Sequence, residues 1–474
     1  MFRYFFKRVN DFVNNFLNHS GIHGFVYLGN TFVLHIFEKF FWLGLICGAL
    51  YLTIHFSLES WDRYLHKNIV VSIERDHYYW NTSLPSFTVC PMERLNRNIY
   101  NKYIQMHDLT HDEKEELFDF LESLANSTYI NFQNIKNTSN TDNILKKLNI
   151  SSSTYLNLIY NLTEDLTIRK MKYLENKMKY EYLKVTQVLT EYGLCYVTNN
   201  FLANNLSTSF LLENKISELH SSFDGKLVHD VVSANIFDGR TSFNLLGFPS
   251  PITVFMHSAY ETMNIARTYG YINETFEFTT HSSEIITTDT LKEDTSISQR
   301  NCRFHSESNL THFKVYTKYL CMSECRLNIA LDLCGCIPWF YFNEVSNPKP
   351  ICSYHQLKTC FPNKKELFLE FKNPQSSKKE RKFECFCLQN CINSFVVVDE
   401  AKPMLLRQYL NGIGILSATE KYPQLRYIRE EIFTLTDFFV SVGATAGLFL
   451  GLSVLGFIEI FYYFSIRLFL FITE

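Results

Sequence analysis

Two long apolar runs, one near each end of the chain, dominate its hydrophobic pattern. The first run, residues 40–58, contains no Asp, Glu, Lys or Arg. The second, residues 438–458, is equally free of these residues and continues past Glu459 to Ile466. A helix needs about 20 apolar residues to cross the hydrocarbon layer. Both runs therefore predict membrane-spanning helices, over residues 40–58 and within residues 432–466. A cleaved signal peptide is a poorer interpretation of the first run, because 39 residues precede it.

The chain between the runs, residues 59–431, mixes strand and helix patterns and predicts an α+β domain. β-branched runs bounded by turn residues predict strands at residues 85–90, 251–255 and 395–398.

Helical patterns fill the part of this domain near residues 108–190. Thr110 and Glu113 have capping-box spacing and precede an apolar face that ends at Leu124. A second stripe with apolar residues every three or four positions, from Met171 to Leu189, predicts another helix. The Asn-, Ser- and Thr-rich residues 126–154 between them predict a solvated, glycosylated loop.

The charge pattern gives the orientation and excludes one class of partner. The net charge is −3 and no basic stripe is present, so a nucleic-acid interface is not indicated. Residues 1–39 hold four basic residues against two acidic ones (Arg3, Lys7, Arg8 and Lys39; Asp11 and Glu38), a mild positive-inside bias. We therefore expect a multi-pass plasma-membrane protein with both termini cytosolic, in which residues 1–39 and a short tail, residues 467–474, lie inside.

Cysteines and glycosylation sequons support an extracellular position for residues 59–431. Twelve of the thirteen cysteines lie there, and the remaining one, Cys47, lies in the first apolar run. An even number of cysteines in one loop favours disulfides in an oxidising compartment. Zinc sites at Cys334–Cys336 or Cys385–Cys387 are disfavoured, because paired zinc ligands are usually separated by two to four residues. The loop also holds eight sequons, at Asn81, Asn126, Asn137, Asn149, Asn161, Asn205, Asn273 and Asn309.

The two apolar runs differ in chemistry. The second contains Gly443, Gly447 and Gly451 at four-residue spacing, which is typical of close helix packing. An ion pathway is the competing interpretation, because the acidic Glu459 at membrane depth marks such a pathway. Residues 451–453 (Gly-Leu-Ser) offer the backbone carbonyls and hydroxyl from which selectivity filters are built. One such span cannot enclose a pore, so this interpretation requires an oligomer.

Several motifs resemble those of the degenerin/epithelial sodium channel family, and most closely its insect pickpocket subfamily. They are His23-Gly24, residues 80–90, residues 192–196 (YGLCY), residues 299–304 (QRNCRF), residues 334–338 (CGCIP) and residues 447–453 (GLFLGLS). The resemblance covers about residues 20–465.

The resemblance implies a trimer, homomeric or heteromeric, that conducts sodium ions and is sensitive to amiloride. Each subunit would have a palm β-sheet, a helical finger near residues 100–190 and a thumb near residues 302–391, with the second spans lining the pore. The family's pairing pattern implies six disulfides, Cys90–Cys195, Cys302–Cys391, Cys321–Cys387, Cys325–Cys385, Cys334–Cys360 and Cys336–Cys352.

The resemblance also implies roles for single residues. Gly451, Leu452 and Ser453 would form the selectivity filter, and Gly447 would contact the blocker. Gating positions would be His23 and Gly24, in a cytosolic motif remote from Ser453, and Val440 or Ser441 at the outer end of the span. Asp437 would attract cations at the outer mouth, and Glu459 would face the ion pathway.

Two other functions compete with this interpretation. An ATP-gated channel shares the two-span topology and cysteine richness, but it needs clustered lysines for phosphate. A membrane-anchored ecto-enzyme such as a nucleotidase needs phosphate-binding loops, and the segments FDGK (residues 223–226) and FDGR (residues 237–240) lack the small-residue turn that cradles phosphate. The sequence therefore indicates a channel rather than an enzyme, with no cofactor and no metal site.

Overall fold

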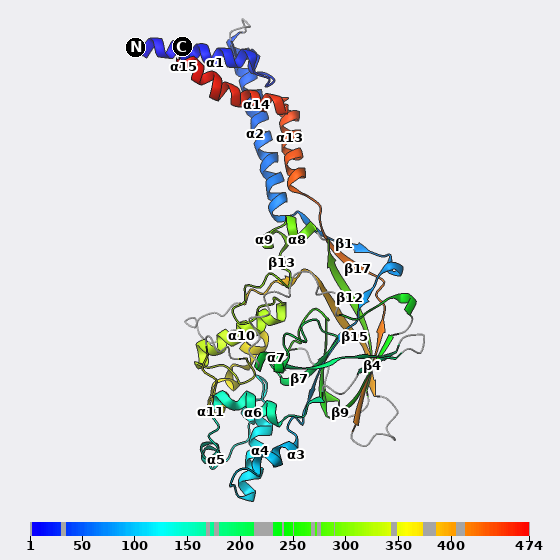
Figure 1. Cartoon of the computed structure of the whole chain (residues 1–474). Coiled ribbons are helices and arrows are strands. Elements are labelled where there is room, and N and C mark those ends of the chain that lie inside the picture. The colour runs from blue at the N-terminus through cyan, green and yellow to red at the C-terminus, as the bar shows by residue number, and fades with distance from the viewer. Residues whose placement is uncertain are drawn as a thin grey trace. The chain divides into compact units, whose positions relative to one another are not determined.

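The computed structural model describes residues 2–29, 35–166, 171–174, 180–212, 231–238, 241–249, 251–266, 271–272, 276–288, 290–342, 348–372, 385–403 and 413–473. The chain forms two compact units (Figure 1). The first, the span unit, comprises Met1–Val71, Thr288–Arg300 and Arg429–Glu474. The second, the disulfide unit, comprises Ser72–Thr287 and Asn301–Ile428.

The span unit is helical. Its helices are α1 (Phe2–His19), η1 (Phe25–Tyr27), α2 (Ile36–His66), α8 (Thr290–Asp294), α9 (Ile297–Arg300), α13 (Leu435–Leu450), α14 (Val454–Tyr462), the π-helical turn η10 (Tyr463–Arg467) and α15 (Leu468–Thr473). Two helical segments are long and apolar enough to cross a membrane, Ile36–His66 and Val454–Phe471. Helix α13, at 16 residues, is a shorter apolar helix.

The first long helix extends beyond the predicted residues 40–58 at both ends. It begins after His35, whose backbone N–H donates to Glu38 at 3.0 Å in a capping box. It continues through the polar residues Glu59, Asp62 and Arg63 and ends at His66. Hydropathy marks only the apolar part of a helix, whereas the caps set its true length.

Two sheets organise the disulfide unit. One has the order β1-β17-β12-β16-β9-β4-β5, with β15 also paired to β12. Its strands are β1 (Ile69–Glu74), β4 (Met171–Leu174), β5 (Tyr180–Leu183), β9 (Thr241–Pro249), β12 (Phe276–Thr287), β15 (Asn393–Pro403), β16 (Ile413–Lys421) and β17 (Arg426–Glu431). Strands β1 and β17 carry the chain from one unit to the other.

The second sheet has the order β11-β10-β3-β7-β6. Its strands are β3 (Ser86–Pro91), β6 (Val185–Thr190), β7 (Gly193–Thr198), β10 (Ile252–His257) and β11 (Tyr271–Ile272), and two smaller pairs are β2 (Thr82–Ser83) with β8 (Ser233–Ala234) and β13 (Cys302–Arg303) with β14 (Gln389–Asn390). The three predicted strands are confirmed as β3, β10 and β15. Phe87, Phe243 and Val254 belong to one buried apolar cluster that joins the two sheets.

The helix predicted from Met171 to Leu189 is wrong, because strands β4, β5 and β6 occupy the described part of this range. Residues 175–179 lie outside the described residues. Strand β6 pairs with β7 through a tight turn at Gly193, whose φ of 82° favours glycine. Both faces of β6 are covered: Val185, Thr186, Val188 and Leu189 are buried. A strand buried on both faces has no two-residue alternation, so its apolar spacing resembles a helix.

Short helices form the rest of the disulfide unit. They are α3 (Arg97–Ile104), α4 (His111–Ala125), α5 (Thr141–Lys147), α6 (Tyr155–Leu162), α7 (Thr208–Leu212), α10 (Lys318–Cys334), α11 (Tyr354–Cys360) and α12 (Lys365–Glu370), with short turns η2 (His77–Tyr79), η3 (Phe132–Asn134), η4 (Ser152–Thr154), η8 (Ile236–Asp238) and η9 (Pro362–Lys364). The predicted capping box of α4 is confirmed: Thr110 N–H donates to Glu113 at 2.8 Å.

Residues 126–154 are not the solvated loop that their composition predicts. They contain η3 and α5, and Tyr129, Phe132 and Ile144 are buried in the largest apolar cluster. A few aromatic and aliphatic side chains fix this polar segment to the core, although they are too sparse to form a periodic pattern.

Six disulfides tie the disulfide unit together, and they are the six pairs that the resemblance implies. The pairs are Cys90–Cys195, Cys302–Cys391, Cys321–Cys387, Cys325–Cys385, Cys334–Cys360 and Cys336–Cys352. Helix α10 contributes Cys321, Cys325 and Cys334. The remaining cysteine, Cys47, is free and exposed.

The sequons differ in accessibility. The side chains at Asn81, Asn137, Asn149, Asn161 and Asn309 are exposed, and Asn205 is half-buried. Asn126 is also half-buried, and its Nδ2 donates to Met92 O at 2.7 Å and to Glu122 O at 3.1 Å. Because an N-linked glycan is carried on Nδ2, this geometry argues against Asn126 as an acceptor. Asn273 lies outside the described residues.

We expect Cys321→Ser to destabilise the disulfide unit and to expose a new thiol. A disulfide that closes a long loop contributes about 2–4 kcal/mol, and Cys321 and Cys387 are 66 residues apart. In a Cys47→Ser background, maleimide labelling of the purified chain followed by peptide mapping should detect a reactive Cys387, and the thermal unfolding midpoint should fall. Cys47→Ser alone is the control and should change neither stability nor labelling of the twelve paired cysteines. An unlabelled Cys387 with an unchanged midpoint would contradict the pairing.

Candidate ion pathway

The second apolar segment breaks at Gly451-Leu452-Ser453. Helix α13 ends at Gly451, which has a φ of 65°, and the N–H of Leu452 donates back to Ala446 O at 3.3 Å. A left-handed glycine with such a back-bond is a common helix terminator. Helix α14 then begins after Ser453, whose Oγ accepts the N–H of Gly456 at 3.1 Å. The predicted span over residues 432–466 is therefore two helices joined by the three predicted filter residues.

The break leaves backbone carbonyls free. The N–H of His23 donates to Leu450 O at 3.1 Å, which satisfies one carbonyl at the end of α13. Within the described residues, no hydrogen bond reaches the carbonyl oxygens of Gly451 and Leu452. Carbonyls without partners at membrane depth are tolerated where they line a cavity or contact water and ions.

The segment around His23 contacts this break directly. A Cβ at Gly451 would overlap the His23 ring, so both the backbone conformation and the contact require glycine there. A Cβ at Gly21 would lie 3.3 Å from Oε2 of Glu459. The expectation that His23 and Gly24 are remote from Ser453 is therefore wrong. It was based on their position in the sequence, which does not predict a segment that folds back on the second span.

Helix α2 holds the same segment from its other side. Gly24 has a φ of 94°, and a Cβ there would lie 3.2 Å from Ile46 Cγ1. The rings of Tyr27 and Trp42 stack with centroids 4.3 Å apart. These contacts place the His23-Gly24 turn between α2 and the break, although no sequence pattern marks Ile46 or Trp42 as its partners.

Helices α2 and α13 lie side by side (Figure 1) and pack along their length. The rings of Phe56 and Phe449 stack at 5.8 Å, and those of Trp61 and Phe438 meet edge to face at 5.2 Å. Between them, the hydroxyl oxygens of Ser60 and Ser441 are 2.9 Å apart. The sequence did not indicate that Ser60 contacts Ser441.

The two predicted gating positions on α13 therefore differ. Ser441 faces α2, whereas Val440 is 65% exposed. The exposed residues of α13 continue along this helix at Gly443, Ala444, Gly447 and Leu448. Nothing lies within 4 Å of a Cβ built at Gly443, so the small-residue stripe does not pack against α2.

Asp437 lies in the first turn of α13 and is exposed. Its Oδ2 accepts the N–H of Thr434 at 2.9 Å, and its own N–H donates to Thr434 Oγ1 at 3.2 Å. This capping box starts the helix and fixes a carboxylate at its N-terminal end.

Comparison with known proteins identifies the family to which the chain belongs. The family model described as amiloride-sensitive sodium channel matches residues 16–463. Pickpocket protein 19 of Drosophila melanogaster is 22% identical over 479 residues, covering 94% of this chain and 89% of that protein. Sodium channel protein Nach of Drosophila ananassae is 30% identical over 185 residues, covering 36% of this chain and 34% of that protein. The chain thus spans about a third of the Nach protein that it matches.

We expect Gly451→Ala and Gly443→Ala to have opposite effects on stability. Alanine at a left-handed position costs about 1–2 kcal/mol, and overlap with the His23 ring adds about 1–3 kcal/mol. Alanine at the open, helical Gly443 should instead stabilise by about 0.5–1 kcal/mol. The measurement is the thermal unfolding midpoint of the detergent-solubilised full chain. A Gly451→Ala protein as stable as Gly443→Ala would contradict the described contact.

Proposed function

Because the chain belongs to the amiloride-sensitive sodium channel family, whose members are ion channels and not enzymes, we propose that it is one subunit of a trimeric, amiloride-sensitive sodium channel. The observation that carries this proposal is the helix break with free carbonyls at Gly451 and Leu452. Family membership replaces both the ecto-enzyme and the ATP-gated interpretation.

In this proposal Gly451, Leu452 and Ser453 of each subunit form the selectivity filter. Sodium is strongly hydrated, and it crosses a narrow site where protein oxygens replace its lost water. The carbonyls of Gly451 and Leu452 are available for this role because no hydrogen bond reaches them from the described part of the chain. The hydroxyl of Ser453 caps α14 through its lone pairs, so it also fixes the geometry of the break.

The proposed assembly is a trimer. A single second span cannot enclose a pore, so three copies, of this chain or of related subunits, would bring their α13 helices together. The face of α13 opposite α2 carries Val440, Gly443 and Gly447. It would line the pore, with Val440 as the gate and Gly447 as the blocker contact. Asp437 would attract cations at the outer mouth, and Glu459 would lie beyond the filter next to Gly21.

We propose a plasma-membrane location with both termini cytosolic and residues 59–431 outside. Six disulfides fit an oxidising compartment, and five exposed sequons fit glycosylation. The spans would be residues 40–58 and 432–466, followed by the cytosolic tail 467–474. The finger would lie near residues 100–190 and the thumb near residues 302–391. His23 would influence gating through its contact with Gly451, and Gly24 through its packing against α2.

We expect Ser453→Cys to lower the preference for sodium over potassium. A thiol sulfur is a poorer ligand for sodium than a hydroxyl oxygen and a weaker helix cap, so the filter would lose both part of its ligand field and its rigidity. The measurement is the reversal potential of amiloride-blockable current in oocytes under sodium and potassium gradients. Ser465→Cys is the control. Ser465 lies in η10, outside the break at residues 451–453, so this substitution should leave the reversal potential unchanged.

If residues 451–453 only pack helices, Ser453→Cys would alter expression and leave the permeability ratio unchanged. An unchanged ratio in a well-expressed channel would remove the filter assignment.

We expect Val440→Trp to give sustained, amiloride-blockable current. Closure would bring three copies of Val440 together, and overpacking costs about 1–3 kcal/mol at each site. Phe439→Trp is the control, because Phe439 is equally exposed at 64% but carries no proposed gating role. Ser441→Trp should instead disturb the contact with Ser60 and reduce expression. Wild-type gating in a surface-expressed Val440→Trp channel would contradict the assignment.

A further inference from the structure

A partly enclosed cavity of about 100 Å³ lies inside the disulfide unit, against helix α10. Its walls are largely buried apolar side chains, among them Leu189, Leu202, Leu320 and Phe340. Leu189 and Phe340 belong to one apolar cluster of this unit, and Leu202 and Leu320 belong to another. The cavity therefore occupies the seam between two hydrophobic cores.

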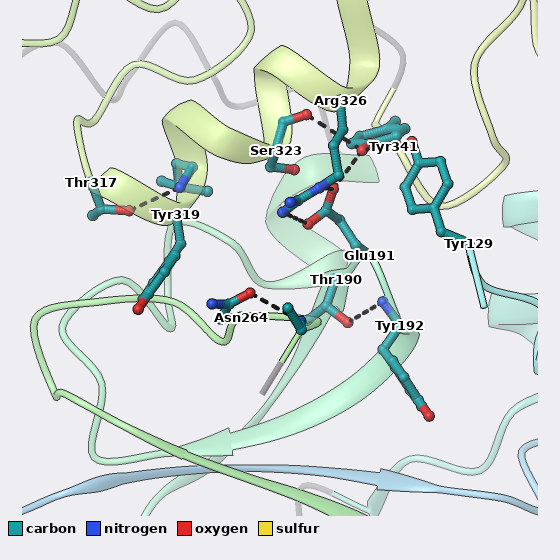
Figure 2. Close-up of polar contacts among 12 residues, drawn as sticks. Tyr129, Thr190, Glu191, Tyr192, Asn264, Thr317, Tyr319, Ser323, Arg326 and Tyr341 are labelled. Atoms are coloured by element: carbon teal, nitrogen blue, oxygen red, sulfur yellow. Dashed lines mark hydrogen bonds and ion pairs between the residues drawn. The ribbon is translucent and has the colours of Figure 1, made fainter. Parts of the chain in front are cut away.

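Two polar side chains at this cavity have no protein partner. Ser323 on α10 is 7% exposed, and within the described residues its hydroxyl makes no hydrogen bond. Its carbonyl oxygen does accept the Tyr341 hydroxyl at 3.4 Å, as Figure 2 shows. The ring of His312 contacts Phe313 and Tyr341 at centroid distances of 4.8 and 6.4 Å. Its ring nitrogens likewise have no partner in the described chain. Both side chains line the cavity and are able to pair with a hydrogen-bonding group of an occupant.

The buried charges beside the cavity, Glu191 and Arg326, are paired with each other. Glu191 accepts two hydrogen bonds from Arg326, at 2.7 and 2.6 Å, and a third from the Tyr341 hydroxyl at 2.6 Å (Figure 2). Burial opposes the charge of Arg326, but the Glu191 carboxylate holds the pKa of the guanidinium above its usual value. Burial lowers the pKa of His312 to about 4, so this ring is neutral at pH 7. Lys314 also lines the cavity but is only half-buried, so it offers a charged ligand no more than a solvent-screened countercharge. A charged ligand would lose its hydration for little return.

We propose that this cavity is a binding site for a small, uncharged amphipathic molecule that has a ring-sized apolar body and one hydroxyl or carbonyl group. The apolar body would lie against Leu202 and Leu320, and the polar group would bond to Ser323 and His312. The cavity is smaller than the roughly 150 Å³ apolar cavity that accommodates benzene, but it is only partly enclosed. One edge of the ring would therefore extend through its open side. Ordered water is the alternative occupant. Ligand binding at this cavity does not depend on ion conduction, so the binding proposal can be tested independently of the proposed channel function.

The test measures binding of 4-fluorophenol to the detergent-solubilised full chain by fluorine NMR. Ser323→Leu fills the cavity, and Asn328→Leu is the matched control, because Asn328 is exposed on the same helix and does not line the cavity. We expect Asn328→Leu to bind like the unmodified chain and Ser323→Leu to bind at least tenfold more weakly. Ser323→Ala should weaken binding by about threefold to tenfold, the value of one hydrogen bond.

The charged analogue 4-fluorobenzoate tests the chemical class, and it should bind more weakly than 4-fluorophenol. Equal binding by Ser323→Leu and Asn328→Leu would show that the probe partitions into detergent or another site, and would overturn the proposal. No binding to the unmodified chain would leave ordered water as the occupant and would also overturn it. If Ser323→Leu fails to fold, Ser323→Ala decides, because it removes the hydroxyl without adding volume.

Discussion

Every backbone N–H and C=O group in a membrane-spanning segment needs a hydrogen-bond partner. At the break between α13 and α14, the two helices do not provide partners for all of these groups. The helix stops at Gly451, so carbonyls at its end and N–H groups at the start of α14 lose their helical partners. His23 supplies one donor and Ser453 supplies one acceptor. The segment of residues 20–29 packs against α2 and brings the His23 N–H within 3.1 Å of Leu450 O. Within the described residues, the carbonyl oxygens of Gly451 and Leu452 have no hydrogen-bond partner, so they remain able to coordinate an ion.

The disulfide unit achieves rigidity by different means. Helix α10 is joined by disulfides to Cys387, Cys385 and Cys360. Arg326 of the same helix bonds to Glu191, at the end of the β6–β7 hairpin. The three disulfides and the ion pair together restrict movement of α10 relative to the rest of the disulfide unit. The cavity beside Ser323 is consequently preformed, and a ligand would not have to order its walls.

The sequence predicted those features that depend on local chemistry. Apolar length identified both spans, β-branched runs identified β3, β10 and β15, and Thr110 with Glu113 identified the start of α4. It failed where tertiary burial overrides periodicity. Strand β6 is covered on both faces and so resembles a helix, and Phe132 and Ile144 fix a polar segment in the core. The disulfide pairs came from resemblance, because twelve cysteines allow many pairings. Contacts between distant segments, such as His23 with Leu450 and Ser60 with Ser441, leave no periodic signal in either segment.

The distribution of side-chain size along the second span also bears on how copies would assemble. The exposed residues of α13 include the small Gly443, Ala444 and Gly447 beside the large Phe439, Val440 and Leu448. The exposed residues of α14 are large and apolar, such as Val454, Leu455 and Phe457. Lipid contact favours large apolar side chains, whereas small residues allow close approach of another helix or of water. The small residues of α13 are compatible with the proposed assembly, in which α13 would face the other copies and α14 would face lipid. The change of face occurs at Gly451–Ser453, where the helix is interrupted and its direction is free to change.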